Sequence, residues 1–244
     1  MIAASFNAYI YHPMYNALAF LISVVPGGDV GLAVIILTVL VRIILFPLAF
    51  SASRTQRAMR AVDPELKALR EKLKDNKEEL ARETMALFKK NKINPFASIF
   101  FIIVQIPIII GLYWVFSAEG ASLVFDPAIL YSFVEVPSAA SLMLFGVFDL
   151  SGKSIVLAVL VAVTQYFYAS LLMPIAPVST GKSFQDDLSK SMHIQMRYVF
   201  PLILGVIAYA ISGVIALYFL VANIFGILQE LVVKRLHDKQ GVSR

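Results

Sequence analysis

The sequence predicts an all-α membrane protein with five transmembrane helices, an N-terminal interfacial helix and a cytoplasmic two-helix hairpin. Hydrophobic residues make up 59% of the 244 residues, and the mean hydropathy is +0.79. This apolar share exceeds that of a typical soluble domain. Five runs are apolar and nearly all long enough to cross a bilayer, and basic residues concentrate between them on one side.

The expected spans are residues 29–50, 95–117, 154–173, 197–211 and 212–233. The fourth is short for a hydrocarbon core of about 30 Å, unless its first residues begin near the membrane surface. Ser212 and Gly213 leave room only for a minimal turn between the last two spans.

The distribution of positive charge predicts the orientation. Nearly all Lys and Arg residues fall in or beside residues 51–94, 174–196 and 234–244; Arg42 and Lys153 are the exceptions. Since cytoplasmic loops are enriched in Lys and Arg, these are the cytoplasmic hairpin, the cytoplasmic loop and the cytoplasmic tail. The N-terminus is therefore outside and the C-terminus inside.

Residues 1–28 are expected to form an amphipathic helix on the outer surface, because apolar residues recur at helical spacing but polar ones interrupt them. A sixth span is the alternative, although no basic residue would hold its start inside. Residues 118–153 form the outer loop. Its apolar piece, Leu142–Phe148, is too short to span and is expected at the membrane interface.

Residues 51–94 are charge-rich and predict two antiparallel helices. Asp63 and Pro64 are typical of a helix start, with Asp63 as the N-cap. Asn76 and Glu79 have the spacing of a second helix cap. Two narrow apolar stripes would join the helices: Leu66, Leu69 and Leu73 in one, and Leu80, Leu87 and Phe88 in the other. This hairpin is either a solvated connector or a docking arm for a partner.

Arg42 lies inside the first span, eight residues or roughly 12 Å from its end. A central arginine costs roughly 2.5–3.5 kcal/mol on insertion scales, so such a residue is a candidate functional site. Snorkelling to the headgroups is the alternative, but the depth argues against it.

Other polar residues within the spans could line a hydrated groove together with Arg42, although each alone more often joins helices. They are Thr38, Gln105, Thr164, Gln165, Gln195, Tyr218 and Asn223. Apart from Asp29, the first residue of the first span, no acidic residue precedes Glu230 within the spans.

Enzyme signatures are missing from the sequence. There is no cysteine, no phosphate-binding glycine motif and no nucleophile elbow, and the three histidines lack metal-ligand spacing. We therefore expect neither enzymatic activity nor a metal or other cofactor.

Several segments resemble the YidC/Oxa/Alb insertase family. VGLAVIILTVLVRIILFPL resembles its first core span, with Thr38 and Arg42 at matching positions, and ETMALFKKNKINPF resembles the exit of its hairpin. VQIPIIIGLYWVF resembles the second span and SGVIALYFLVANIFGILQE the last. The chain departs from the family at Tyr218-Phe219, where a Tyr-Tyr pair is common.

The resemblance implies a membrane protein insertase or chaperone of the bacterial cell membrane. Its implied partners are the lipid bilayer, nascent membrane proteins, and the ribosome, Sec translocon or signal recognition particle receptor at residues 54–92. The alternatives are a small anion channel or transporter with Arg42 as an anion site, and a membrane-anchored scaffold.

Overall fold

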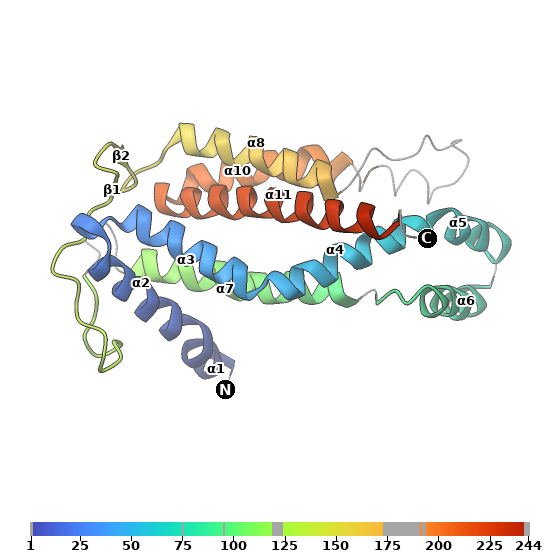
Figure 1. Ribbon diagram of the computed structural model, residues 1–244, viewed down its shortest axis with the longest axis horizontal. Helices are drawn as coiled ribbons and strands as arrows, with labels where there is room; N and C mark the ends of the chain where they lie inside the picture. Colours follow the sequence, from blue (N-terminus) through green and yellow to red (C-terminus); the bar gives the residue numbers. More distant parts are fainter. Residues whose placement is uncertain are drawn as a thin grey trace. The chain divides into compact units, whose positions relative to one another are not determined.

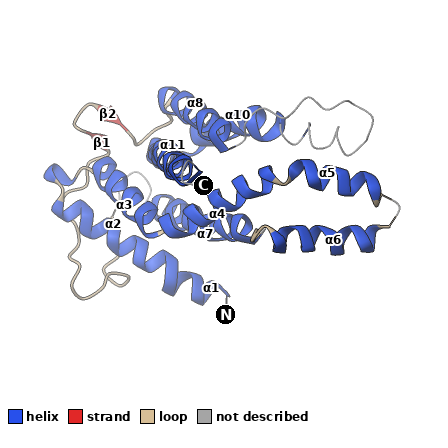
Figure 2. Cartoon of the chain, turned by 45° about the vertical axis from the view of Figure 1, so that its right-hand side comes forward, coloured by secondary structure: helices blue, strands red, loops and turns tan. Residues whose placement is uncertain are grey.

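Helices dominate the computed structural model (Figures 1 and 2), which describes residues 2–74, 76–94, 96–118, 124–172, 191 and 194–241. The chain divides into two compact units, which are described separately. The first contains Met1–Ile44 and Pro107–Glu230, and the second contains Leu45–Ile106 and Leu231–Arg244.

The first unit begins with a continuous helical segment, α1 (Ile2–Phe6), a π-helical turn (Asn7–Tyr11) and α2 (His12–Val24). A short turn, Pro26–Gly28, leads to α3 (Val30–Ile44). Its remaining helices are α8 (Ile155–Leu172), a second π-helical turn (Gln195–Val199) and α10 (Phe200–Ile211). Two helices cross the division between the units: α7 (Phe96–Ala118) and α11 (Gly213–Gly241).

Two helices within the described residues are long and apolar enough to cross a membrane, Ile155–Leu172 and Gly213–Arg235. The pair α3 and α4 (Phe46–Ala61) would make a third if it forms one broken span. Residues 103–116 and 195–211 form shorter apolar helices. These helices fit an all-α membrane protein, as the composition predicts.

The first predicted span, residues 29–50, is not one helix. α3 ends at Ile44, and α4 begins at Phe46 with a proline, Pro47, in its first turn. Proline has no N–H to donate within a helix, so it suits a helix start better than a helix interior. Pro47 is therefore the sequence signal that marks this break.

The apolar side of α2 packs against protein. Tyr15, Leu18 and Ala19 have no exposed surface. The Tyr15 hydroxyl accepts a hydrogen bond from the Asp126 N–H at 2.6 Å, and its ring meets Phe125 edge-on at 5.0 Å. This buried face of α2 thus has a loop and neighbouring helices of the first unit as its partners.

Asn16, one of the polar residues that interrupt the apolar run, joins α2 to the same loop. Its Oδ1 accepts from the Tyr131 N–H at 2.6 Å, and its Nδ2 donates to the Ile129 carbonyl at 3.0 Å. The side chain is 3% exposed. The buried amide of Asn16 is thus satisfied by two backbone groups of this loop.

α10 and α11 are separated by Ser212 alone, which confirms the predicted minimal turn. The Gly213 N–H donates to the Gly152 carbonyl at 2.8 Å, and a Cβ on Gly213 would lie 2.9 Å from the Leu150 Cα and carbonyl oxygen. Only glycine at position 213 lets the Leu150 backbone come this close without a shift of the surrounding backbone. α8, α10 and the first part of α11 run side by side from this turn (Figure 1).

The apolar piece Leu142–Phe148 forms a β-hairpin, which is an exception to the expected all-α fold. Strands β1 (Met143–Leu144) and β2 (Phe148–Asp149) are antiparallel. The hydroxyl and N–H of Ser151 donate to Asp149 Oδ1 at 2.6 and 2.8 Å, and these bonds lower the pKa of the Asp149 carboxyl. Asp149 is therefore charged at neutral pH.

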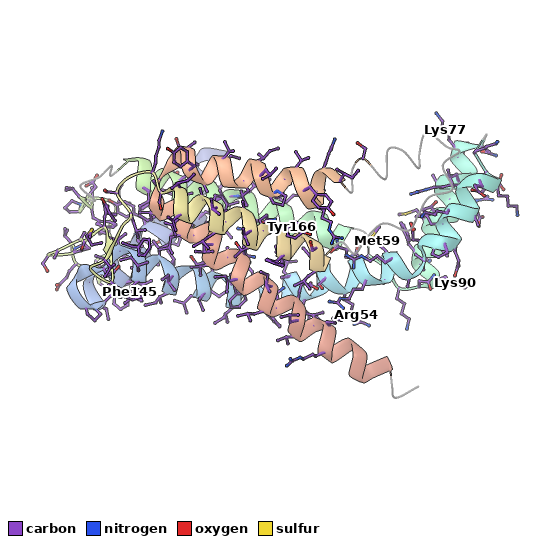
Figure 3. All side chains as sticks on the ribbon, turned by 90° about the horizontal axis from the view of Figure 1, so that it is seen from above. Arg54, Met59, Lys77, Lys90, Phe145 and Tyr166 are labelled. Carbon is purple, nitrogen blue, oxygen red and sulfur yellow. The ribbon has the colours of Figure 1, made fainter. Side chains whose placement is uncertain are left out.

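The second unit contains the predicted hairpin, formed by α5 (Asp63–Lys72) and α6 (Lys77–Lys90). Leu66 and Phe88 are buried between the helices, as expected, whereas the other predicted stripe residues are half-buried. Val62 and Ile93 complete the cluster and were not predicted. Lys77 and Lys90 lie at the two ends of α6 (Figure 3).

The two predicted caps have different outcomes. Asn76 caps α6 as expected, because its Oδ1 accepts from the Glu79 N–H at 3.1 Å. The prediction that Asp63 caps α5 is wrong. Val62 is the N-cap, and the Asp63 carboxylate instead contacts Lys67 Nζ at 3.0 Å. The reason is that α4 leads into α5 through Val62, so Asp63 already lies in the first helical turn.

We predict that Phe88→Ala loosens the hairpin within the intact protein. Loss of a buried phenylalanine costs about 3 kcal/mol or more, which would reduce amide protection in α5 and α6 by about 100-fold. Hydrogen–deuterium exchange measures this. Met85→Ala is the matched control, because Met85 is 53% exposed on the same helix; equal exchange in both variants would contradict the role of the cluster.

We predict that Gly213→Ala destabilises the fold although alanine favours helices. The added methyl group would press on the Leu150 backbone, and such overpacking costs about 1–3 kcal/mol, or a fall in Tm of about 2–8 °C. Thermal unfolding in detergent measures the change. Gly152→Ala serves as the control, since a Cβ there meets nothing within 4 Å; an equal fall in both variants would contradict the explanation.

Candidate functional site

Arg42 lies in the last turn of α3 on the buried side of the helix. Val30, Val34 and Thr38 precede it at intervals of four residues, and all three are at most 2% exposed. Residues four apart share one helix face. This face is therefore apolar at Val30 and Val34 and polar at Thr38 and Arg42. Arg42 itself is 9% exposed. The structure therefore directs this charge inward.

Thr38 does not engage Arg42 directly. Its hydroxyl donates to the Val34 carbonyl at 2.7 Å, one turn back along α3. Back-bonding of this kind satisfies a hydroxyl locally. Thr38 thus contributes a small polar side chain beside Arg42 without consuming the hydrogen-bonding capacity of the guanidinium.

Within the part of the chain that the structure describes, Arg42 forms no hydrogen bond and no ion pair. Its electrostatic neighbour is Tyr168 on α8, whose hydroxyl also interacts with Glu230 on α11. Glu230 is 3% exposed. Three helices of the first unit therefore bring a cation, a phenol and a carboxylate into one electrostatic neighbourhood.

Tyr168 was not predicted as a site residue. It packs against a glycine on the facing helix: a Cβ on Gly226 would lie 2.8 Å from the Tyr168 ring. Small residues at helix interfaces allow close approach of a bulky neighbour. The pairing of Gly226 with Tyr168 exists only after α8 and α11 are packed, so the sequence alone could not reveal it.

Two predicted residues, Thr164 and Asn223, join α8 to α11. Asn223 Nδ2 donates to the Val161 carbonyl and to Thr164 Oγ1, both at 3.3 Å. Thr164 donates in turn to the Leu160 carbonyl at 2.7 Å. Since Asn223 is 5% exposed, these contacts satisfy a buried amide and fix the two helices together.

Tyr218 and Phe219 are both buried, at 3% and 8% exposed, with ring centroids 5.5 Å apart. Both aromatic rings are therefore packed inside the protein, although Phe219 stands where the family commonly has a second tyrosine. Gln165 is also buried, at 9% exposed. Val159, on the same helix as Gln165, is 53% exposed and lies on an apolar face of α8.

Two further predicted residues are described by the elements that carry them. Gln195 is exposed on the π-helical turn before α10. Gln105 belongs to the second unit, on the same helix as Pro107. The candidate residues described in the first unit are therefore Arg42 and Thr38 on α3, Thr164, Gln165 and Tyr168 on α8, and Tyr218, Asn223 and Glu230 on α11.

The site offers the positive charge of Arg42, neutral hydrogen-bonding groups and, near Tyr168, the carboxylate of Glu230. Among the described residues, no group of three His, Cys, Asp or Glu side chains could hold a metal ion. The arrangement suits reversible attraction of an anion or a carboxylate, since a guanidinium binds carboxylate through charge-assisted hydrogen bonds.

Comparison with known proteins gives a consistent assignment. The family model described as 60Kd inner membrane protein matches residues 21–240. The membrane protein insertase MisCA of Bacillus subtilis is 29% identical over 93% of this chain and 78% of its own length. The membrane protein insertase YidC of Oceanobacillus iheyensis is 30% identical over 84% of this chain and 74% of its own length.

A further relative, the membrane protein insertase YidC of Clostridium tetani, is 27% identical over 90% of this chain and 88% of its own length. The similarity thus extends over the helices that carry Arg42, Tyr168 and Asn223. This chain belongs to the 60Kd inner membrane protein family, the YidC/Oxa/Alb family of membrane protein insertases.

Proposed function

We propose that this protein inserts and chaperones membrane proteins, moving substrate spans into the bilayer through a hydrophilic groove that contains a single arginine, Arg42. The observation that carries the proposal is the inward-facing Arg42, 9% exposed and without an ion pair among the described residues. A buried charge without a fixed partner is costly unless water or a transient ligand solvates it. The insertases to which the chain is similar support the same assignment.

The proposed setting is the bacterial cell membrane, crossed five times with the N-terminus outside. α8 and residues 213–235 of α11 support two of the five spans by length and composition. The segregation of Lys and Arg supports the orientation. The helical segment that contains α2 is the outer interfacial helix in this arrangement.

Arg42 would attract an acidic residue in the translocated part of a substrate while the substrate's apolar part moves into lipid. Burial of a Leu or Phe side chain contributes about 1.5–3 kcal/mol, whereas a charged residue at the bilayer centre costs roughly 2.5–3.5 kcal/mol. A few apolar side chains therefore offset one charge, and no covalent step or cofactor is required.

Tyr168 and Glu230 would set the strength of this attraction. The Glu230 carboxylate and the Arg42 guanidinium both act electrostatically on the Tyr168 hydroxyl. Since Arg42 forms no short ion pair among the described residues, a substrate carboxylate could bind it and leave again. A direct, short ion pair would hold Arg42 more strongly and slow each cycle.

The hairpin of α5 and α6 is proposed as a docking arm for the ribosome, the Sec translocon or the signal recognition particle receptor. It belongs to the second unit and is held by a small cluster of buried apolar residues. Most of its charged side chains face solvent. Such a module can offer charges to a partner without disturbing the spans.

A small anion channel is the second candidate, because a guanidinium without an ion pair also suits an inorganic anion. Ion flux measured in proteoliposomes separates the two functions. An insertase without channel activity gives no chloride flux while inserting a single-span protein.

We predict that Arg42→Ala reduces insertion of substrates with acidic translocated segments by roughly tenfold or more, the equivalent of one charge-assisted hydrogen bond of about 1.5–3 kcal/mol. Arg42→Lys should retain part of the activity, since charge matters more than fork geometry in a hydrated site. Insertion into proteoliposomes of matched acidic and neutral substrates measures both effects.

The matched control for Arg42 is Lys153→Ala, which removes a positive charge from an exposed residue outside the site. It should leave both substrates unaffected. If Arg42→Ala impairs acidic and neutral substrates equally while thermal unfolding stays normal, the electrostatic role is wrong.

We predict that replacing Asp63–Phe88 with a flexible linker abolishes complementation in cells but leaves thermal unfolding of the remaining helices unchanged. The reason is that the buried cluster of the hairpin involves only residues of the second unit. The full-length chain carrying a linker of equal length in the outer loop controls for expression. Full complementation by the deletion variant would make the hairpin a connector only.

A further inference from the structure

The β-hairpin before α8 exposes three apolar side chains within four residues at and beside its tip. Phe145 is 68% exposed, Val147 75% and Phe148 47%, and Phe145 lies at the tip (Figure 3). Single exposed apolar residues are common, but a contiguous group on a tight turn presents an apolar wedge to its surroundings.

The backbone at this tip adopts a costly conformation. Phe145 has φ of +53° and Gly146 of +70°. Gly146 accepts this region freely, whereas a bulky aromatic residue rarely does, and such strain persists only where the surrounding structure enforces it. The fold therefore holds an aromatic side chain at a position where glycine or asparagine would fit the backbone better.

A buried carboxylate enforces this conformation. Asp29 is 7% exposed, its Oδ2 accepts from the Phe145 N–H at 2.7 Å, and its Oδ1 accepts from the Leu32 N–H at 2.9 Å at the start of α3. The Val30 N–H also donates to the Ser141 carbonyl at 3.0 Å. Hydrogen bonds to Asp29 therefore fix the tip of the β-hairpin to the beginning of α3.

The first turns of α8, which follows the hairpin in the chain, are also apolar and exposed. α8 begins at Ile155, and Ile155, Val156 and Val159 are each more than half exposed. The described part of α8 has 18 residues, about 27 Å at 1.5 Å per residue, which approaches the hydrocarbon core of about 30 Å. Its exposed first turn would therefore lie near one edge of that core.

Charged and aromatic groups mark a water–lipid boundary at the same end of α8. Lys153 Nζ lies 5.8 Å from the centre of the Tyr209 ring, a combination typical of membrane interfaces. The Asp149 carboxylate lies at the base of the hairpin. A lysine can meet lipid phosphate, while an ionised carboxylate keeps the base of the hairpin in water.

From these observations we propose that Phe145, Val147 and Phe148 form a rigid anchor that inserts into the lipid interface beside the first turn of α8. The ligand is the glycerol and upper acyl region of phospholipids. The proposal depends on membrane embedding but not on the proposed insertase activity. The expected depth is about 5–10 Å below the headgroups, as for other interfacial apolar groups.

Depth-dependent fluorescence quenching tests the anchor in the full chain. The single tryptophan, Trp114, is replaced by Phe, and Phe145→Trp introduces a probe at the tip. In phosphatidylglycerol-containing vesicles, lipids brominated near the headgroup should quench this probe more than lipids brominated deep in the chain. Met85→Trp, at an exposed position of the hairpin in the second unit, should be quenched by neither.

Two results would overturn the proposal. Quenching of the position-145 probe no stronger than that of Met85→Trp would leave the tip in water. Protection from aqueous acrylamide without quenching by brominated lipid would assign the tip to a protein partner.

Phe145→Gly separates anchoring from folding. Glycine relieves the positive φ, so Tm in detergent should stay the same or rise, whereas quenching of a Val147→Trp probe by brominated lipid should fall. A lower Tm with unchanged quenching would make Phe145 a structural residue and the anchor proposal wrong.

Discussion

The cost of burying a polar or charged group without a partner is the constraint on which this structure depends. Three buried polar side chains avoid this cost through hydrogen bonds: Asn16 bonds to loop backbone groups, Asn223 bonds to α8, and Thr38 bonds to its own helix. Arg42 differs from these groups, because it is buried and charged and yet forms no hydrogen bond or ion pair among the described residues. The cost of such a charge is the physical basis for the proposed transient ligand.

The scaffold around Arg42 is rigid where the site needs it. α8 is fixed to α11 by the Thr164–Asn223 contact, and to α10 by the close approach of Gly205 to Ala162, where an added Cβ would come within 2.9 Å. The connection of α10 to α11 depends on Gly213. These contacts hold Tyr168 and Glu230 in their positions, so the electrostatic neighbourhood of Arg42 is set by packing and not by a loop.

The candidate site could be predicted in part. A lone arginine in an apolar run is visible in the sequence because hydrocarbon penalises charge so strongly that an exception has meaning. Thr38, Thr164 and Asn223 were found for the same reason, although the last two act in the structure as a helix–helix contact. Tyr168 was missed, since tyrosine is common in spans and its proximity to Arg42 depends on how α3, α8 and α11 pack.

The sequence by itself determined the features that follow from local pattern: the helical class, the apolar runs, the hairpin of α5 and α6, the cap at Asn76 and the turn at Ser212. Helical periodicity and capping act over a few residues, so they can be read without a fold. Tertiary structure decided which face each helix buries. α2 packs on the loop that contains Phe125, Phe145 adopts a positive φ because Asp29 lies nearby, and Val62 and Ile93 join the hairpin cluster. Each of these contacts joins residues from different elements, and their free energy depends on an arrangement in space that no local pattern encodes.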